Sequence, residues 1–295
     1  MPAPGVLLVD KAGGMTSHDV VARARRALGT RKIGHAGTLD PMATGLLILG
    51  VEAATRLLTF IVGLDKTYEA TIRLGARTDT DDAEGETLTS ADASAVTSSA
   101  VAAAIAGLTG EISQVPSSVS AIKVDGRRAY DLMRAGEEVQ LRARAVTVSR
   151  FDVVSERRVG GFLDVDVVVD CSSGTYIRAL ARDLGGALGV GGHLTALRRT
   201  RIGPFGIEDA VPIDGIGAAP LLNPADTAAA VLGSMSVSAA QARDLRHGKR
   251  LMGAASLVER SPIAAIDPSG ALVGIVERRG ADLKSVMNLP EEATP

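Results

Sequence analysis

The sequence of 295 residues has few of the residues that build disulfide, metal or redox sites. A single cysteine, Cys171, excludes an intramolecular disulfide framework and a cysteine-based zinc cluster, and it is typical of a reducing cytoplasm. The four histidines lack the His-x-x-x-His or carboxylate spacing of a metal site. A dinucleotide fingerprint and a phosphate loop are also missing. We therefore expect neither a metal nor any other cofactor.

Long apolar runs are absent as well. No run approaches the roughly 20 residues of a membrane span, and the opening stretch lacks the charged-then-apolar pattern of a signal peptide. Hydrophobic residues still make up 46% of the chain, enough for one large domain and a smaller one. These features predict a cytoplasmic protein with no membrane contact.

The chain also lacks an overall positive charge, since its formal net charge is -2. Much of the negative charge lies between residues 69 and 86, and the stretch from Gly75 to Thr89 is interpreted as a polar, acidic, solvated loop. Basic residues gather elsewhere: Arg23, Arg25, Arg26, Arg31 and Lys32; Lys123, Arg127 and Arg128; Arg198, Arg199 and Arg201. Because phosphate binding needs a local basic surface, this distribution permits an RNA partner without requiring one.

The most informative stretch is G-H-A-G-T-L-D-P-M-A-T-G, residues 34–45. Its glycines allow a close approach to a ligand, and Pro41 pushes Asp40 into an extended conformation. The apolar residues 46–49 predict a buried strand that anchors the loop. The plainer alternative is a glycine-rich turn whose aspartate binds its own backbone. The concentration of His35, two threonines and three glycines beside Asp40 favours a functional loop.

This stretch resembles the catalytic loop of the TruB family of tRNA pseudouridine synthases, which isomerise the uridine at position 55 in the T-loop of tRNA. The resemblance implies that Asp40 is the catalytic carboxylate. It also implies that His35 stacks within the RNA and helps to hold the target nucleotide in its flipped-out state.

Two further motifs match the same family in the same order. Lys66-Thr67-Tyr68 resembles its K-x-Y motif, which implies that Tyr68 stacks on the flipped base and is a candidate for handling the C5 proton. A core position on a strand remains the alternative for Tyr68. Residues 174–178 match the family's G-T-Y-I-R motif letter for letter. This implies that Arg178 pairs with Asp40 and that Tyr176 walls the base pocket. A surface arginine paired with Asp183 is the alternative for Arg178.

Two weaker matches to the family lie outside these three motifs, one at residues 10–17 and one around residue 197. Residues 10–17 resemble the family's D-K-P-x-G-x-T-S motif with Ala12 in place of proline, so Lys11 is a candidate RNA contact. A capped helix, with Ser17 as N-cap and an end at about Leu28, is an equally good interpretation. Leu197, in an L-R-R context, corresponds to a leucine that lines the uracil pocket, although a general core position explains it nearly as well.

The stretch from about 111 to 145 corresponds to the family's thumb-like insertion, which folds over the T-loop. Pro116, clustered serines and basic residues indicate a surface element. The candidate phosphate contacts are Lys123, Arg127 and Arg128, and a helix is predicted from about Arg128 to Ala135.

The resemblance implies an α+β pseudouridine-synthase fold with a mixed, largely antiparallel central sheet, a thumb-like insertion and a small β-rich, PUA-like C-terminal domain. We expect the catalytic domain at 1–225, and a linker with the RNA-binding domain at 226–295. The expected partner is the T-stem-loop of tRNA, bound by a monomer without a protein partner. Two alternatives stay open: a guide-RNA-dependent synthase of the same superfamily, and an RNA-folding chaperone whose catalysis is secondary.

Overall fold

The computed structural model describes residues 2–117, 123–124, 127–128 and 141–290. The chain forms two compact units. The first comprises residues 1–41, 45–63 and 203–295, and the second comprises residues 42–44 and 64–202.

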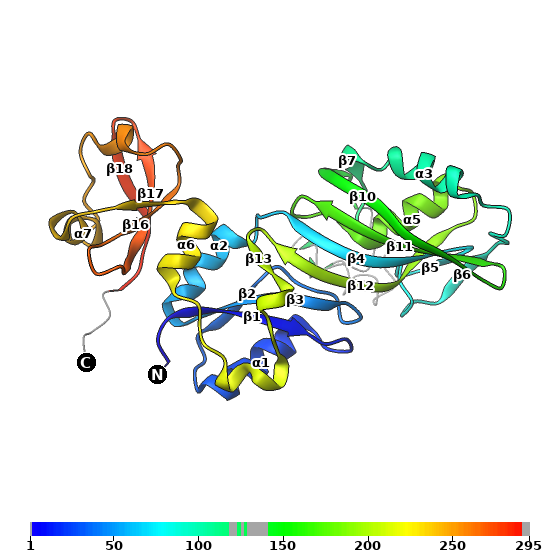
Figure 1. Ribbon diagram of the computed structural model, residues 1–295, viewed down its shortest axis with the longest axis horizontal. Helices are drawn as coiled ribbons and strands as arrows, with labels where there is room; N and C mark the ends of the chain where they lie inside the picture. The colour runs from blue at the N-terminus through cyan, green and yellow to red at the C-terminus, as the bar shows by residue number, and fades with distance from the viewer. Residues whose placement is uncertain (1, 118–122, 125–126, 129–140, 291–295) are drawn as a thin grey trace. The chain divides into compact units, whose positions relative to one another are not determined.

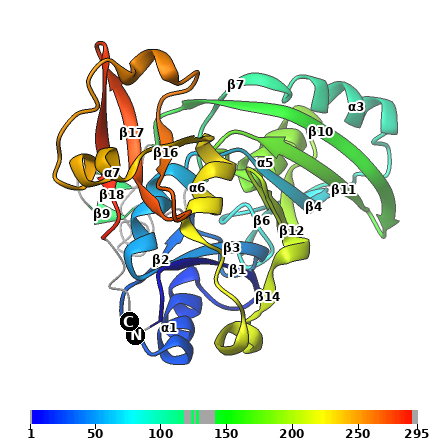
Figure 2. The ribbon, with the colours of Figure 1, turned by 60° about the vertical axis from the view of Figure 1, so that its left-hand side comes forward.

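The first unit contains a small mixed sheet (Figures 1 and 2). Strand β3 (Thr44–Val51) lies between β1 (Gly5–Lys11) and β2 (Ile33–Ala36) and is antiparallel to both, while β14 (Val211–Pro212) runs parallel to β1. Residues 46–49 are fully buried, which confirms the predicted anchoring strand. Strand β3 is followed by a 3-10 turn, η1 (Glu52–Leu57), and by α2 (Leu58–Ile61).

Helix α1 (Ser17–Leu28) packs on this sheet through Val20, Val21 and Ala24. Its N-cap is Thr16 and not Ser17, so that prediction was wrong by one residue. Thr16 and Asp19 form a reciprocal capping box, in which each side chain binds the other residue's backbone N–H. This arrangement releases the Ser17 side chain for another contact, described below.

The second unit is built on five antiparallel strands (Figure 1). Their order across the sheet is β12 (Gly192–Ile202), β4 (Lys66–Leu74), β11 (Phe162–Cys171), β10 (Arg144–Val159) and β7 (Gly110–Gln114). Helices α3 (Ser98–Ala106) and α5 (Ile177–Ala187) belong to the same unit. Helix α3 begins directly after Thr97, whose side chain caps it. The segment at 75–89, interpreted as a solvated loop, instead contains the hairpin β5 (Ala76–Thr78) and β6 (Thr87–Ser90).

Helix α5 meets the start of β12 through glycines. A Cβ atom on Gly185 would lie 2.1 Å from the carbonyl carbon of Gly191, a backbone atom that cannot move away by rotating a side chain. Glycine at this position therefore sets the spacing between helix and strand.

We expect Gly185→Ala to lower the free energy of unfolding by about 3 kcal/mol, because the added methyl overlaps rigid backbone. The neighbouring Gly186→Ala is the matched control, since no atom lies within 4 Å of its added Cβ. That variant should gain about 0.5–1 kcal/mol from the better helix propensity of alanine. Urea unfolding measures both changes, and equal stability of the two variants would contradict the close packing.

The C-terminal part of the first unit forms a small sheet of its own. Its strands follow the order β15 (Ser234–Ser236), β16 (Ile263–Ile266), β17 (Leu272–Arg279) and β18 (Asp282–Asn288). Helix α7 (Ala239–Arg246) covers the core of this sheet through Ala242 and Leu245. The remaining elements are β13 (Phe205–Gly206), η2 (Ile207–Asp209), η3 (Ile213–Ala218), α6 (Pro224–Leu232) and η4 (Ala254–Leu257).

The strand pairings confirm the predicted α+β class with mixed, largely antiparallel strands. Among the described residues, no helix is both long and apolar enough to cross a membrane.

Candidate active site

The loop singled out by its sequence is the turn of the β2–β3 hairpin. His35, on β2, pairs with Leu49, and half-buried Asp40 follows in the turn. Gly37 and Gly45 have φ values of 82° and 103°, a region that other residues rarely adopt. The glycines are therefore required by the path of the loop around Asp40.

The residue after Asp40 is held by Lys11. The Lys11 side chain is fully buried, and its ammonium donates hydrogen bonds to the carbonyl oxygens of Ala12 (3.0 Å), Met15 (2.7 Å) and Pro41 (3.2 Å). The N–H of Gly14 also donates to Pro41 O at 2.9 Å. Lys11 thus joins the opening loop of the chain to the loop that carries Asp40. A direct RNA contact by Lys11 stays a prediction.

The residue before Asp40 is held by α1. Ser17 Oγ accepts a hydrogen bond from Leu39 N at 2.9 Å and donates one to Leu39 O at 3.2 Å. One residue further along, His18 meets the His35 ring edge-on, with ring centroids 5.4 Å apart. The backbone on both sides of Asp40 is therefore fixed by side chains from β1 and α1.

Arg178 lies in the first turn of α5 and is only 4% exposed. Its Nη1 donates to Thr80 O at 2.9 Å and lies 3.4 Å from Asp82 Oδ2. The alternative of a surface arginine paired with Asp183 is wrong, because Asp183 pairs with Arg182 instead. The sequence analysis missed Asp82 as a partner of Arg178.

Asp82 is buried because the β5–β6 segment folds inward around it. Thr78 Oγ1 donates to Asp82 O at 2.7 Å, and Thr80 Oγ1 donates to Asp82 Oδ1 at 2.6 Å. The interpretation of 75–89 as a solvated loop was therefore wrong at its centre, where Asp81 and Asp82 are each 4% exposed.

Asp81 forms a second ion pair with α5. Its Oδ2 lies 3.2 Å from Nη1 of Arg182, and Arg182 also donates to Val115 O at 2.7 Å. Burial raises the pKa of Asp81, while the nearby arginines act in the opposite direction. Two adjacent aspartates therefore pair with two arginines one helical turn apart, at i and i+4. A pair of adjacent aspartates in one segment and a pair of arginines at i and i+4 in another are the signal by which Asp82 could have been found.

Tyr176 precedes α5 and is held by Gln114 at the end of β7. Gln114 is fully buried; its Oε1 accepts from Tyr176 N at 2.9 Å, and its Nε2 donates to Tyr176 O at 3.1 Å. The Arg144 guanidinium lies 5.8 Å from the centre of the Tyr176 ring. Gln114 was also missed, because its function depends on a contact 62 residues away in sequence.

We expect Gln114→Ala to lower the free energy of unfolding by about 2 kcal/mol, because it removes both hydrogen bonds between the buried amide and the backbone of Tyr176, whose carbonyl oxygen keeps only the bond from Leu180 N among those described. It should also raise KM for RNA if the Tyr176 ring walls the base pocket. Gln114→Glu retains the acceptor to Tyr176 N and should be milder in both respects. Chemical denaturation and steady-state kinetics measure the two effects; a KM equal to wild type would separate Tyr176 from the pocket.

Tyr68 and Leu197 lie on the central strands of the second unit. Tyr68, on β4, pairs with Val169 and Arg199 in the neighbouring strands and is 9% exposed. Leu197, on β12, is 8% exposed. Thr44, at the end of the candidate catalytic loop, donates a long hydrogen bond of 3.5 Å to Leu197 O. Both side chains are largely buried, yet each keeps an exposed fraction that a base could contact.

Buried ionisable groups flank Tyr68. Burial and the nearby Arg199 charge lower the pKa of Lys66 to about 8. Burial raises the pKa of Cys171 to about 11, so its thiol stays protonated at neutral pH. Cys171 is 1% exposed at the end of β11, where it packs as a small core residue.

The candidate phosphate contacts of the thumb-like insertion are described only in their backbone. Lys123 and Arg127 begin the two-residue strands β8 (Lys123–Val124) and β9 (Arg127–Arg128), in which Lys123 pairs with Arg128. The helix predicted from about Arg128 to Ala135 lies outside the described residues except for Arg128, which belongs to β9. In the described part of the chain, no group of His, Cys, Asp and Glu residues could hold a metal ion.

Three family models together match residues 25–290 of the chain. A family model described as "TruB family pseudouridylate synthase (N terminal domain)" matches residues 25–177. The chain belongs to the TruB family of pseudouridine synthases. Two further models, for the C-terminal domain of tRNA pseudouridylate synthase B and the C-terminal part of tRNA pseudouridine synthase II, match residues 178–234 and 233–290.

TruB family members named tRNA pseudouridine synthase B are similar over almost the whole chain. The relative from Leifsonia xyli subsp. xyli is 58% identical over 99% of this chain and 98% of its own length. The relative from Rhodococcus jostii is 57% identical over 96% of this chain and 93% of its own length.

Solved structures of much lower sequence identity share the fold of this chain. An H/ACA ribonucleoprotein bound to a substrate RNA containing 2′-deoxyuridine has a TM-score of 0.70 at 24% identity, over 98% of this chain and 86% of that one. An archaeal box H/ACA complex of Nop10 with Cbf5 also has a TM-score of 0.70, at 23% identity, over 98% and 87%. These neighbours confirm the fold class.

Proposed function

We propose that the chain converts uridine 55 in the T-loop of tRNA to pseudouridine. The observation that carries the proposal is the position of Asp40 in a hairpin turn whose two neighbouring residues are fixed by Ser17 and Lys11. The names of the relatives, tRNA pseudouridine synthase B, support tRNA as the substrate.

The reaction breaks the N1–C1′ bond, turns the base over and forms a C5–C1′ bond. It is an isomerisation without a change of redox state. It needs an ionised carboxylate beside the sugar, a pocket for the freed uracil and a group that handles the C5 proton. In the proposal, Asp40 supplies the carboxylate, either by attack on C1′ or by removal of the 2′ proton.

Arg178 is proposed to pair with Asp40, which favours the ionised carboxylate and orients it. Its contacts with Asp82 and Thr80 support this role, because they hold the guanidinium in a fixed position. Asp82 is in this view a positioning residue for Arg178. A guanidinium has five donors, so it can bind Asp82, Thr80 and a further carboxylate together.

The base pocket is proposed to consist of Tyr68, Tyr176 and Leu197. Extruding a base from a folded loop costs a few kcal/mol, and each base–aromatic stack returns about 1–3 kcal/mol. Tyr68 would stack on the flipped uracil and is the candidate for handling its C5 proton. His35 would stack within the RNA and help to hold the uridine in its flipped-out state.

The remaining parts are proposed to bind the rest of the tRNA. The thumb-like insertion, with Lys123, Arg127 and Arg128, would contact T-arm phosphates. The small C-terminal sheet would act as a PUA-like RNA-binding domain, with the division at about residue 225. We propose that the protein works as a monomer in the cytoplasm, without a protein partner or a cofactor.

The test is pseudouridine mapping on an unmodified tRNA transcript incubated with the purified protein alone. Conversion of a single T-loop uridine, without added RNA or protein, is the expected result. Conversion only after a guide RNA is added would favour the guide-dependent alternative. Binding and refolding of the transcript without any conversion would favour an RNA chaperone.

A further inference from the structure

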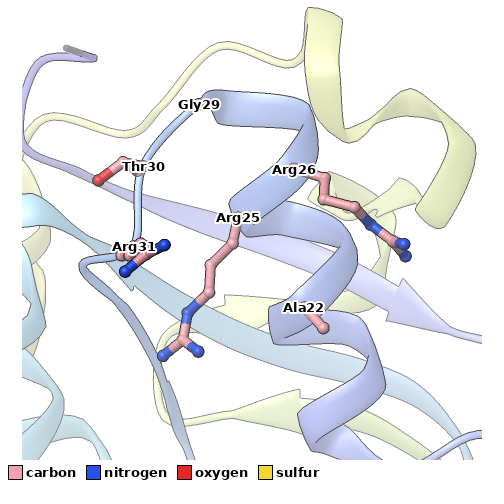
Figure 3. A pocket seen from close by; sticks show the side chains of 6 residues that line it. All are labelled: Ala22, Arg25, Arg26, Gly29, Thr30 and Arg31. Carbon is pink, nitrogen blue, oxygen red and sulfur yellow. The ribbon is translucent and has the colours of Figure 1, made fainter.

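A basic hollow lies at the C-terminal end of α1, in the first unit. Its volume is about 660 Å³, and it is lined by Ala22, Arg25, Arg26, Gly29, Thr30 and Arg31. Figure 3 shows Arg25 and Arg31 directed to one side of α1, while Arg26 is directed to the other side. The guanidinium groups of Arg25 and Arg31 therefore share one side of the hollow.

The charges of these arginines are not neutralised by the described residues. Within that part of the chain, Arg25, Arg26 and Arg31 make no ion pair, whereas the neighbouring Lys32 pairs with Glu52 at 3.5 Å. Arg25 donates one hydrogen bond, to Ile33 O at 3.0 Å, which fixes its direction. The hollow therefore combines fixed positive charge with open space.

Helix capping does not account for this cluster. The C-terminal end of α1 is closed by backbone groups, since the N–H groups of Gly29 and Thr30 both donate to Arg25 O. Gly29 has a φ of 65°, and this left-handed turn brings Arg31 back beside Arg25. The interaction of an exposed arginine charge with the dipole at the helix C-terminus is worth only about 0.3–1 kcal/mol. The arginine side chains thus remain available for an external anion.

We propose that this hollow binds a backbone phosphate of the substrate RNA, outside the nucleotide that is modified. Guanidinium groups match phosphate oxygens in both charge and geometry. Helix α1 joins the hollow to the candidate catalytic loop, because Ser17 at its first residue holds Leu39. Ser17 and Gly29 are twelve residues apart, about 18 Å along the axis at about 1.5 Å per residue. An RNA stem with a loop nucleotide at Asp40 carries phosphates within this range, so the inference rests on the proposed function.

The test compares Arg31→Gln with wild type in binding a T-arm stem-loop and a full-length tRNA transcript over a series of salt concentrations. Loss of one phosphate contact should weaken binding about fivefold to tenfold at physiological salt and reduce the salt slope by about 1. The rate at saturating RNA should not change, because the exposed Arg31 lines the hollow at the C-terminal end of α1 and not the turn that carries Asp40. A stem shortened until it no longer reaches the hollow should remove the difference between the two proteins.

Arg23→Gln is the matched control. Arg23 is exposed on the same helix and does not line the hollow, and the variant loses the same charge. If Arg23→Gln lowers affinity and slope as much as Arg31→Gln, the effect belongs to the general field of the protein, and the site is overturned. If Arg31→Gln binds RNA like wild type but no longer binds inorganic phosphate, the hollow takes free phosphate and the RNA assignment is wrong.

The two proposals fail separately. Pseudouridine formation by the wild-type protein tests the reaction, whereas the salt slope of Arg31→Gln tests the hollow. Activity without any effect of Arg31→Gln overturns only the hollow. Weakened RNA binding by this variant, with no activity in the wild type, overturns only the reaction.

Discussion

Replacement of Asp40 by asparagine is expected to reduce pseudouridine formation by at least about a thousandfold. The amide has nearly the same shape as the carboxylate, but it carries no charge and neither attacks C1′ nor accepts a proton at neutral pH. Binding of the tRNA should change little, because phosphate contacts and base stacking supply most of the affinity. Single-turnover mapping of the T-loop uridine and a parallel binding titration measure the two quantities.

The matched control is Asp209→Asn, which removes the same charge from an exposed 3-10 turn and should modify tRNA like wild type. A rate for Asp40→Asn within about tenfold of wild type would show that another group provides the chemistry. Loss of binding along with activity would instead mean that Asp40 supports the fold of the loop.

Replacement of Asp82 by asparagine is expected to lower the free energy of unfolding by about 3 kcal/mol and the maximal rate by about a hundredfold. The side chains of Arg178 and Asp82 are only 5% and 6% exposed, so loss of the carboxylate removes a buried ion pair and leaves the Arg178 charge less well compensated. The rate should fall because Arg178 is no longer held where it can orient Asp40. KM for the tRNA should change little, since Asp82 is proposed to contact no RNA.

Asp183→Asn is the control for this prediction. Asp183 pairs with Arg182 at 2.9 Å, but its side chain is 32% exposed, and such pairs contribute about 0–1 kcal/mol. Denaturant unfolding and single-turnover kinetics on both variants separate the two kinds of ion pair. A variant Asp82→Asn that is unstable but fully active when folded would restrict Asp82 to a structural role.

Local sequence signals were sufficient for the elements that bring Asp40 into position. The buried strand at 46–49 follows from hydrophobicity alone, and α1 ends at Leu28 as expected. The cap of α1 was misplaced by one residue, because Thr16 and Ser17 are both good caps. Only the tertiary contact with Leu39 decides between them.

The inward fold of the segment around Asp82 was not predictable from hydrophobicity. Its residues are polar, and they are buried because Arg178 and Arg182 neutralise them, not because they are apolar. Gln114 was missed for a related reason, since a buried amide is recognised only by its partner. Composition indicates where apolar residues go, but the pairing of polar groups depends on the completed fold.

The attachment of both neighbours of Asp40 also affects the conformational entropy of the reaction. A free glycine-rich loop would lose about 1–2 kcal/mol per residue when it becomes ordered around a substrate. Here Ser17 and Lys11 order Leu39 and Pro41 during folding of the chain itself. The free energy of RNA binding is then not consumed in arranging the loop, and it remains available for unstacking the uridine.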